Sequence, residues 1–560
     1  MTNTLYFGDN LTVMRDYIKP QSVDLIYLDP PFNSKRNYNI FFDSTENKAE
    51  NAQVMVFEDF FYWNDETNKT YEDLKTQGPA RLFELISGLV SVFGRNSQTT
   101  AYLVMMAARL KEINRILKPT GSLYLHCDPA AGHYIKLVLD CIFDEKNFRN
   151  HITWKRTSAH NDAKHWGHIS DIIFFYTKSD AYTWNKVYTK YSKEYIDNFY
   201  RYKDKDGRIF RVGDLTAAGV SKGESGRPWR GVDPTKNDRH WAVNREFLND
   251  PDIPASPLAA LDYLDSAGRI YWPEKGIVPG FKRYLDEMPG APVQEVITDI
   301  PPLSANAKEK LGYPTQKPLA LLERILAASS NAGDVVFDPF CGCGTTIVAA
   351  QKMERQWLGI DASYLAVNLV EKRLKDVARL AEWQVIGAPI DLKSAQNLAD
   401  RDKYQFQYWA CALIEARPYN DRIKGSDRGI DGKIFFSDDQ RNVKKEKQII
   451  VSIKGGKNVG VDMIRDLRGT IARENAAIGV FVTLTRPTRP MIDEAHSAGC
   501  YCSPDGAKYP KIQILTIEKL LNGQKVTKPI DLTYGAATFK KARPSAVRYQ
   551  DDLFRQARNS

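Results

Sequence analysis

The chain contains 560 residues, which is too long for one typical domain, so two to four structural units are expected. Hydrophobic residues make up 43% of it and charged residues 26%, and no apolar stretch approaches the roughly 20 residues of a membrane span, so we expect no membrane segment. The net charge of +9 favours a polyanionic partner. The seven cysteines give no disulfide framework and no zinc-ligand spacing, so we expect a protein of the reducing cytoplasm without a zinc site.

The first 150 residues alternate between apolar runs with strand character and segments with helical periodicity. This pattern predicts strands at 5–7, 23–28 and 123–126, helices at 11–18, 105–117 and 134–143, and loops over about 33–100. Because strands and helices alternate, we expect a parallel, doubly wound α/β sheet.

The alternation stops between 151 and 312, where Tyr, Trp, Lys and Arg are frequent, and it resumes over 313–385. The resumed pattern predicts strands at 335–338 and 357–361, with helices beginning at Pro318 and Thr345. We therefore expect 1–150 and 313–385 to be two halves of one domain that carries the segment between them as an insert.

Residues 386–403 are expected to be a linker to a second α/β domain over 404–560. The pattern there predicts helices at 404–416, 462–475, 488–498 and 516–522, and strands at 430–436, 448–454, 477–484 and 511–515.

The first turn whose residues are candidates for catalysis is Asp29-Pro30-Pro31-Phe32, which directly follows a predicted apolar strand. An exocyclic amine of adenine or cytosine is a poor nucleophile, because its lone pair is conjugated into the ring. The Asp29 carboxylate and the Pro30 carbonyl can accept hydrogen bonds from the two N–H bonds, and Pro31 stiffens the turn. Phe32 offers a flat surface on which an extruded base can stack.

A second turn, Asp338 to Thr346, follows another buried strand and contains Gly342 and Gly344. These glycines let the backbone approach a ligand, but the third glycine of a dinucleotide fingerprint is absent. Asp361 ends the next strand, where a carboxylate can bind ribose hydroxyls. The second turn therefore favours a nucleoside-containing cofactor.

With these motifs, the first 385 residues resemble an amino-group DNA methyltransferase of the adenine-N6/cytosine-N4 family, in the subgroup whose catalytic motif precedes its cofactor motif. The stretches that carry the resemblance, in chain order, are Gly8-Asp9, Asp29 to Phe32, Leu125 to Asp128, Tyr313 to Pro318, Asp338 to Thr346, and Gly359 to Asp361. The resemblance implies a Rossmann-like methyltransferase sheet and S-adenosylmethionine as cofactor, without a metal for methyl transfer.

The resemblance also assigns residues to roles in the predicted site. The catalytic residues would be Asp29, Pro30, Pro31 and Phe32, and the cofactor residues would be Asp9, Thr315, Lys317, Asp338, Phe340, Gly342, Gly344 and Asp361. His126 ends another strand at the same edge, where it fits either a wall of the base pocket or a structural strand end. An Asp at the start of the catalytic turn resembles adenine-N6 enzymes more than cytosine-N4 enzymes.

The insert at 151–312 stands where this family carries its target-recognition region, so its basic and aromatic residues are expected to contact duplex DNA. The strongest candidates lie between Gly219 and Trp241: Arg227, Trp229, Arg230, Lys236 and Arg239. A solvated loop with structural tryptophans is the alternative for each of them. The recognition sequence does not follow from these residues.

The C-terminal pattern resembles the restriction-endonuclease-like fold of the Mrr-type group, through residues 429–432 and 451–456. In active relatives an acidic residue, and a Glu or Gln two positions before a Lys, bind magnesium. Asp431 and Lys454 match that pattern, Ser452 stands where Glu or Gln is expected, and Glu415 is a candidate for a replacement carboxylate. The resemblance thus leaves two alternatives, a magnesium nuclease and a DNA-binding module.

The sequence as a whole favours an adenine-N6 DNA methyltransferase that flips its target base, within a restriction-modification or phage-defence system. The alternatives are a bifunctional methyltransferase and magnesium-dependent endonuclease, and a cytosine-N4 methyltransferase. A homodimer and a restriction-system partner are both compatible with the sequence.

Overall fold

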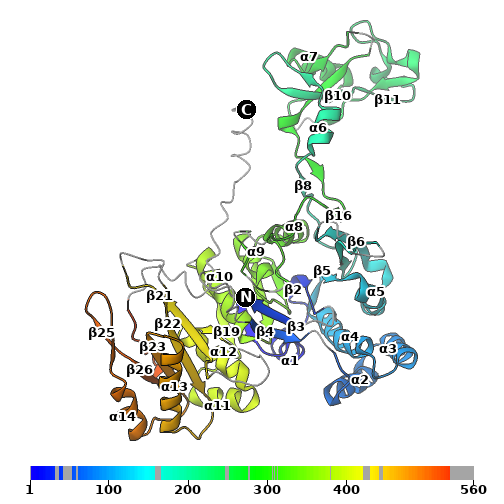
Figure 1. Ribbon diagram of the computed structural model, residues 1–560. Coiled ribbons are helices and arrows are strands. Elements are labelled where there is room, and N and C mark those ends of the chain that lie inside the picture. The colour runs from blue at the N-terminus through cyan, green and yellow to red at the C-terminus, as the bar shows by residue number, and fades with distance from the viewer. Residues whose placement is uncertain are drawn as a thin grey trace. The chain divides into compact units, whose positions relative to one another are not determined.

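The computed structural model (Figure 1) describes residues 2–31, 37–41, 53–58, 61–157, 166–245, 251–274, 278–304, 307, 309–311, 313, 315–378, 380–419, 429–439 and 446–529. The chain divides into two compact units, Met1–Asn185 together with Glu295–Ser560, and Lys186–Gln294. Within the described ranges, no helix has the length and apolar character needed to cross a membrane.

A nine-stranded sheet organises the N-terminal part of the first unit, in the order β16-β6-β7-β5-β2-β17-β18-β1-β19. Its strands are β1 (Thr4–Phe7), β2 (Val23–Leu28), β5 (Leu117–Cys127), β6 (Phe148–Lys155), β7 (Ser170–Thr177), β16 (Val296–Ile297), β17 (Val335–Asp338), β18 (Gln356–Asp361) and β19 (Gln384–Ile386). The six strands from β5 to β19 are parallel, whereas β7 runs antiparallel to β5 and β6. The carboxyl ends of the six parallel strands therefore meet at one edge.

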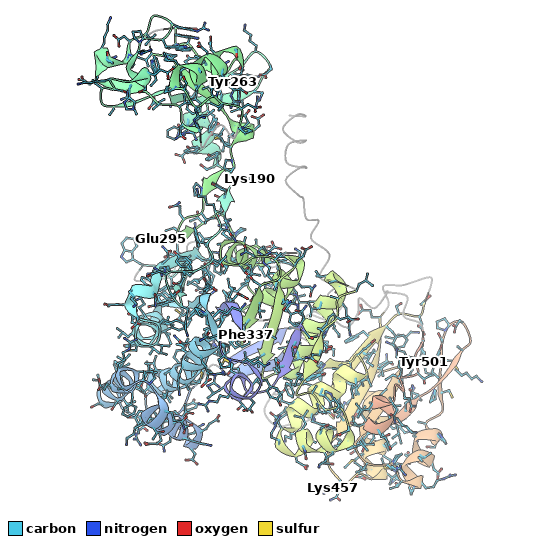
Figure 2. The ribbon with its side chains drawn as sticks, turned by 180° about the vertical axis from the view of Figure 1, so that it is seen from behind. Lys190, Tyr263, Glu295, Phe337, Lys457 and Tyr501 are labelled. Carbon is cyan, nitrogen blue, oxygen red and sulfur yellow. The ribbon has the colours of Figure 1, made fainter. Side chains whose placement is uncertain are left out.

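Successive side chains on these strands point to opposite faces of the sheet and pack in two hydrophobic cores, one on each face. Leu25 and Tyr27 of β2 belong to one core, while Ile26 and Leu28 belong to the other. Phe337 of β17, labelled in Figure 2, lies in the middle of the sheet. Helices α8 (Leu319–Ser329), α9 (Thr345–Lys352) and α10 (Tyr364–Val377) cover the first face, and α1 (Asn10–Tyr17), α4 (Gln98–Ile116) and α5 (Pro129–Phe143) the second. The predicted doubly wound α/β fold is confirmed.

The prediction of loops over 33–100 is wrong for much of that segment. It contains the antiparallel pair β3 (Asn37–Phe41) and β4 (Gln53–Glu58), the helices α2 (Asp65–Gln77) and α3 (Ala80–Phe93), and the beginning of α4. The polar composition concealed short apolar pairs at helical spacing, such as Tyr71 with Leu74 and Leu82 with Ile86, whose side chains are buried.

The second unit, Lys186–Gln294, is narrower than the predicted insert at 151–312. The difference arises because β7 pairs with β5 and β6 pairs with β7, so that both strands belong to the nine-stranded sheet. The unit contains a four-stranded sheet and a small core around Trp229 and Trp241. Its sheet is formed by β9 (Tyr202–Lys203), β10 (Ile209–Asp214), β13 (Ile270–Tyr271) and β14 (Gly280–Tyr284), and its main helix is α7 (Pro257–Ser266).

The C-terminal domain has a five-stranded sheet in the order β20-β21-β22-β23-β26. Its elements are β20 (Arg417–Pro418), β21 (Gly432–Phe436), β22 (Lys447–Lys454), β23 (Ile478–Thr483), β26 (Ile512–Thr516), α12 (Lys403–Leu413), α13 (Val461–Arg473), α14 (Arg489–Ser497) and α15 (Ile517–Leu521). These bounds agree closely with the predicted elements. The predicted linker instead contains the helix α11 (Leu392–Arg401). Asp391 and Ser394 form a reciprocal capping box at its N-terminus.

Candidate functional site

The acidic residues singled out from the sequence gather at the carboxyl edge of the parallel sheet. Asp338 and Asp361 are the last residues of β17 and β18, and Asp29 follows β2. Neighbouring strands in the order β2-β17-β18 bring the three carboxylates to the same edge. A ligand site is expected there in an open α/β sheet.

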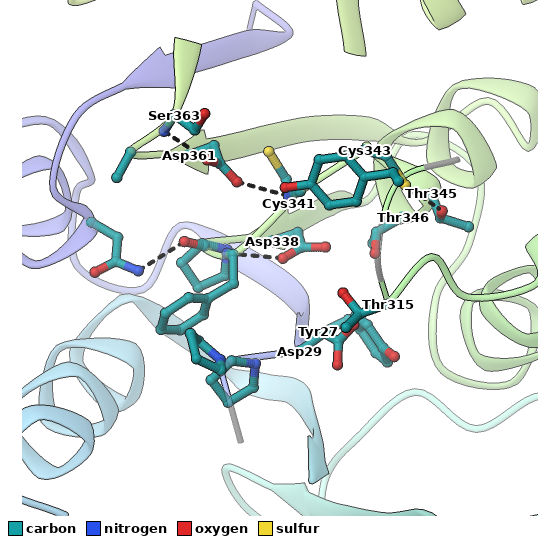
Figure 3. A pocket seen from close by; sticks show the side chains of 18 of the residues that line it. Tyr27, Asp29, Thr315, Asp338, Cys341, Cys343, Thr345, Thr346, Asp361 and Ser363 are labelled. Atoms are coloured by element: carbon teal, nitrogen blue, oxygen red, sulfur yellow. Dashed lines mark hydrogen bonds between the residues drawn. The ribbon is translucent and has the colours of Figure 1, made fainter. Parts of the chain in front are cut away.

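A cavity of about 490 Å³ lies at this edge (Figure 3). Most of the predicted catalytic and cofactor residues line it: Asp9, Asp29, Pro30, Pro31, Thr315, Lys317, Asp338, Phe340, Gly342 and Asp361. Phe32 lies outside the described residues, so its stacking role stays a prediction. The motifs before and after the insert thus meet in one cavity, although about 300 residues separate them in the chain.

The turn after β17 is held in a conformation that requires glycine. Gly342 has φ 48° and Gly344 has φ 74°, in the left-handed region that favours glycine. A Cβ atom on Gly344 would stand 2.7 Å from a methyl group of Val370. The Gly342 amide donates a hydrogen bond of 2.9 Å to Asp361 Oδ2, which joins the turn to the next strand. Gly342 lines the cavity and Gly344 does not, so Gly344 acts by fixing the turn from which its neighbours Cys343 and Thr345 line the cavity.

Burial raises the pKa of two of the three carboxylates. The pKa of Asp338 rises to about 7, against hydrogen bonds from Thr346 and the Phe340 amide that lower it. The pKa of Asp361 rises to about 6, although the amides of Ser363 and Gly342 donate to it. A cationic or hydrogen-bond-donating ligand would relieve the cost of keeping these groups ionised.

The Asp29 carboxylate is paired with a lysine from the second half of the domain. Lys317 Nζ lies 2.5 Å from Asp29 Oδ2 and 3.2 Å from the Thr315 carbonyl oxygen. The Lys317 side chain is 8% exposed and that of Asp29 is 17% exposed. Lys317, predicted from the family motif as a cofactor residue, therefore contacts the predicted catalytic carboxylate directly.

Several residues of the cavity were not identified from the sequence. Arg109 of α4 pairs with Asp9 at 2.7 Å and donates to Asn10 at 2.6 Å, and Asn10 in turn donates to the Pro339 carbonyl. Tyr27 lines the cavity two residues before Asp29. No local motif marks Arg109, because its position depends on how α4 packs against α1.

The C-terminal domain also contributes to this cavity, through the first turn of α12. Asp402 and Gln405 both line it, and Gln405 Oε1 accepts a hydrogen bond of 2.8 Å from the Tyr364 amide at the start of α10. These residues lie at the boundary that the sequence assigned to a linker, and no sequence pattern connects them with the methyltransferase motifs.

The predicted DNA-contact residues of the insert divide into two groups. Trp229 is 5% exposed, stacks on Trp272 and donates to Asp262, which favours the alternative of a structural tryptophan over a DNA contact. Arg230 pairs with Asp265 at 2.8 Å, and Arg239 donates to Thr216.

The side chains of Arg227 and Lys236 are exposed and remain candidates for phosphate contacts.

The nuclease-like residues lie on the β21–β22 hairpin and on α12. Asp431 Oδ1 accepts from Gln407 at 2.9 Å and Oδ2 accepts from the Ile453 amide at 2.6 Å, while Lys454 Nζ is 4.0 Å from Oδ2. Glu415 is exposed beyond the end of α12, and its charge acts on Lys372 of the methyltransferase half.

Gln407, rather than Glu415, is thus the α12 side chain bonded to Asp431. In the part of the chain that the structure describes, no three His, Cys, Asp or Glu side chains are grouped to hold a metal ion.

The sequence matches two family models. A DNA methylase model (N6_N4_Mtase) matches residues 23–372, more than half of the chain, and a restriction endonuclease model (Mrr_cat) matches residues 398–521. The type II methyltransferase M.EcaI of Enterobacter cloacae is 29% identical over 375 residues, covering 67% of this chain and 69% of that protein. The StyLTI Mod subunit of a type III restriction-modification enzyme of Salmonella typhimurium is 27% identical over 371 residues, covering 63% of this chain and half of that protein.

Matches to solved structures have lower identity. The M1.HpyAVI complex with SAM has a TM-score of 0.29 and 17% identity, and the match covers 66% of this chain and 98% of that one. The cytosine-N4-specific PvuII DNA methyltransferase has a TM-score of 0.30 and 14% identity, with 67% and 86% covered. The family model, together with the topology and the cavity residues described above, shows that the chain belongs to the DNA methylase family.

Proposed function

We propose that this protein transfers a methyl group from S-adenosylmethionine to the exocyclic amine of a base in duplex DNA, with adenine N6 as the target. The observation that carries the proposal is the cavity itself, because the Asp29 turn and the Asp338–Asp361 pair line the same space. A base-polarising group and a cofactor-binding turn in one cavity are what direct methyl transfer requires.

The residues of the cavity fit S-adenosylmethionine by size and by charge. A space of about 490 Å³ is typical of a small-molecule site. Asp361 accepts two backbone amides and retains acceptor capacity for ribose hydroxyls, since a carboxylate can accept about four hydrogen bonds. Asp338, buried and with a raised pKa, suits a neighbouring cation. When bound, the cofactor supplies an electrophilic methyl group on a sulfonium.

The chain's own residues would orient and activate the amine. Asp29 Oδ2 is engaged by Lys317, and we propose that Oδ1 and the Pro30 carbonyl accept from the two N–H bonds of the target amine. This pairing would draw the nitrogen lone pair out of conjugation and direct it at the methyl group. Lys317 would hold the Asp29 carboxylate in that orientation.

The test is methylation of plasmid DNA by the purified full chain, followed by identification of the methylated nucleoside by mass spectrometry. We expect N6-methyladenine from the wild type, and Asp29→Ala should lower the rate by about 10²–10³-fold while cofactor affinity is retained. Asp334→Ala is the control, because Asp334 precedes β17 at the opposite edge of the sheet. Methylcytosine alone, or full activity of Asp29→Ala, would contradict the proposal.

For the remaining domains we propose a role in holding DNA. The insert would recognise the target with exposed basic residues such as Arg227 and Lys236, and their replacement by Ala should weaken binding to all sequences alike.

The C-terminal domain has a second candidate function, magnesium-dependent cleavage, favoured by its restriction endonuclease match and by Lys454 near Asp431. Incubation of methylated and unmethylated plasmid with and without magnesium tests it. Intact plasmid in every condition would leave DNA binding as the function of this domain.

A further inference from the structure

A chain of three buried polar side chains leads from the cavity into the sheet. The Tyr27 hydroxyl lies 2.9 Å from His126 Nδ1, and His126 Nε2 lies 3.0 Å from Asp171 Oδ2. The residues come from the neighbouring strands β2, β5 and β7, and His126 and Asp171 are 0% and 1% exposed. Such a network is costly to bury unless its groups bond one another, and the proposed reaction has so far used none of them.

The direction of each hydrogen bond follows from the charges around the network. Arg156 lies 3.4 Å from the other Asp171 oxygen, and although burial opposes ionisation, its bond to His126 and the nearby cations lower the pKa of Asp171. A carboxylate only accepts, so His126 Nε2 must carry the proton that it shares with Asp171. Burial and the charge of Lys317 lower the pKa of His126, so the ring is neutral at physiological pH.

A neutral ring protonated on Nε2 has a lone pair on Nδ1. The Tyr27 hydroxyl must therefore donate its only proton to Nδ1, which leaves its oxygen lone pairs for other neighbours. Tyr27 lines the cavity together with Asp29 and Thr315 (Figure 3). The network thus converts a hydroxyl that could point either way into a hydrogen-bond acceptor.

We infer that His126 and Asp171 are positioning residues that hold the Tyr27 oxygen as an acceptor beside Asp29, where it stabilises the positive charge that methyl transfer creates on the target amine. The inference rests on the proposed function and gives a role to Tyr27, to Asp171 and to His126, which lies in the motif stretch Leu125 to Asp128. An oxygen lone pair favours the charged transition state, whereas an O–H group pointing the same way would oppose it.

Protonation of His126 would reverse the arrangement. An imidazolium donates from both nitrogens, so Tyr27 would accept from Nδ1–H and turn its own proton away from the ring. The titratable or charged groups around the ring are Tyr27, Asp29, Asp171 and Lys317, with Arg156 acting through Asp171, while Trp154 packs edge-on against it. Because the pKa of His126 is below its usual 6.5, the rate of methyl transfer should fall on the acid side of that value.

The experiment compares four variants of the full chain in single-turnover methyl transfer at saturating DNA and cofactor, as a function of pH. Tyr27→Phe and His126→Leu remove the acceptor and its support. His126→Gln keeps an amide that can accept from Tyr27 and donate to Asp171 but cannot be protonated in this range. Tyr124→Phe is the control, because its buried hydroxyl bonds Ser329 and does not line the cavity.

We expect Tyr27→Phe and His126→Leu to slow transfer by at least about tenfold, as for the loss of one polarising hydrogen bond. Their KM for DNA and their affinity for the cofactor should stay within about twofold of the wild type, and Tyr124→Phe should transfer at the wild-type rate. His126→Gln should transfer at a rate much closer to the wild type than His126→Leu does. Its pH–rate profile should lack the fall at low pH that protonation of His126 causes. Asp338 and Asp361 also titrate near pH 6–7 and would leave their contribution in all variants.

Equal rates in Tyr27→Phe and Tyr124→Phe would overturn the inference, since the hydroxyl would then act only in folding. A loss in His126→Gln as large as that in His126→Leu would overturn it as well. If the wild type itself methylates no DNA, the proposed function fails instead, so the two failures are distinguishable.

Discussion

The cavity of the methylase domain and the hairpin of the nuclease-like domain each contain an aspartate paired with a lysine. Asp29 follows strand β2, and Asp431 precedes strand β21. Asp29 and Lys317 are 2.5 Å apart, and Asp431 and Lys454 are 4.0 Å apart. In the methylase domain, parallel strands deliver further carboxylates to the same edge. In the nuclease-like domain, the described residues leave Asp431 bonded to an amide side chain and a backbone N–H.

The difference shows that a carboxylate and a lysine do not define an active site by themselves. What distinguishes the two regions is whether other strand ends converge on the pair and leave a cavity beside it. Asp29 lines a cavity together with Asp338 and Asp361, whereas one oxygen of Asp431 bonds Gln407 of α12 and the other bonds the Ile453 amide of β22. Substitutions that remove a carboxylate–lysine pair or change the residues around the cavity should therefore affect the two regions differently.

The largest effect is expected from Lys317→Met, which removes the partner of Asp29 in a nearly buried pair. Without the lysine the carboxylate loses its orientation, and the rate of methyl transfer should fall by about 100-fold, an effect of about 2.7 kcal/mol. Single-turnover kinetics and calorimetric titration of the cofactor distinguish a role of Lys317 in positioning Asp29 from a role in binding the cofactor. Positioning predicts a loss of rate with cofactor affinity nearly unchanged. A loss mainly of cofactor affinity would show that Lys317 is a cofactor-binding residue.

Lys352→Met is the matched control for that experiment. Its ion pair with Glu323 at 2.8 Å lies on more exposed side chains, and such pairs contribute little to stability. We expect its rate of methyl transfer to equal that of the wild type.

The next effect concerns the turn after β17, whose residues Gly342, Cys343 and Thr345 line the cavity. Gly344→Ala adds a Cβ that would stand 2.7 Å from Val370 at a backbone φ of 74°. The turn must shift, and cofactor affinity should fall by about tenfold, with a loss of stability of about 1–3 kcal/mol. Gly333→Ala separates the two causes, because Gly333 has φ 84° but no atom lies within 4 Å of the position that the added methyl group would take. Because Gly333 lies at the opposite edge of the sheet, its substitution should leave cofactor affinity unchanged. Equal losses of stability in both variants would show that backbone strain alone causes the loss of stability.

The residues of this site that could be predicted from the sequence are those that lie in a short local sequence pattern. An apolar run followed by Asp predicts a carboxylate at the end of a buried strand, and Asp29, Asp338 and Asp361 all lie where that rule places them. The burial of Trp229 did not follow, because an aromatic residue among arginines has the same local pattern on a surface and in a small core. Arg109 required knowledge of how α4 packs, which no local pattern contains.

A smaller effect is expected from Asp338→Asn, and its sign depends on pH. The folded-state pKa of Asp338 is about 7, above its ordinary value, so folding favours the protonated carboxyl. Its contribution to stability is present at low pH and is lost as the pH rises through about 7. The contribution is lost between the ordinary pKa of 3.8 and about 7. Without cofactor, Asp338→Asn should therefore melt at a higher temperature than the wild type at pH 8, and the difference should be clearly smaller at pH 5. If the difference in melting temperature between the variant and the wild type is the same at pH 8 and pH 5, ionisation of Asp338 is not its cause.

The smallest effect tests how one helix serves both regions. Gln405 and Gln407 lie two residues apart on α12, yet Gln405 accepts from the Tyr364 amide at the cofactor cavity and Gln407 donates to Asp431 on the nuclease-like hairpin. Gln405→Ala removes one hydrogen bond to the methylase half, which corresponds to about 0.5–1.5 kcal/mol and a loss of cofactor affinity of about two- to tenfold. Gln407→Ala should leave cofactor affinity unchanged, because its partner is in the other site. If the two variants weaken cofactor binding equally, α12 acts on the cavity through its overall packing, and the separation of the two regions along this helix is wrong.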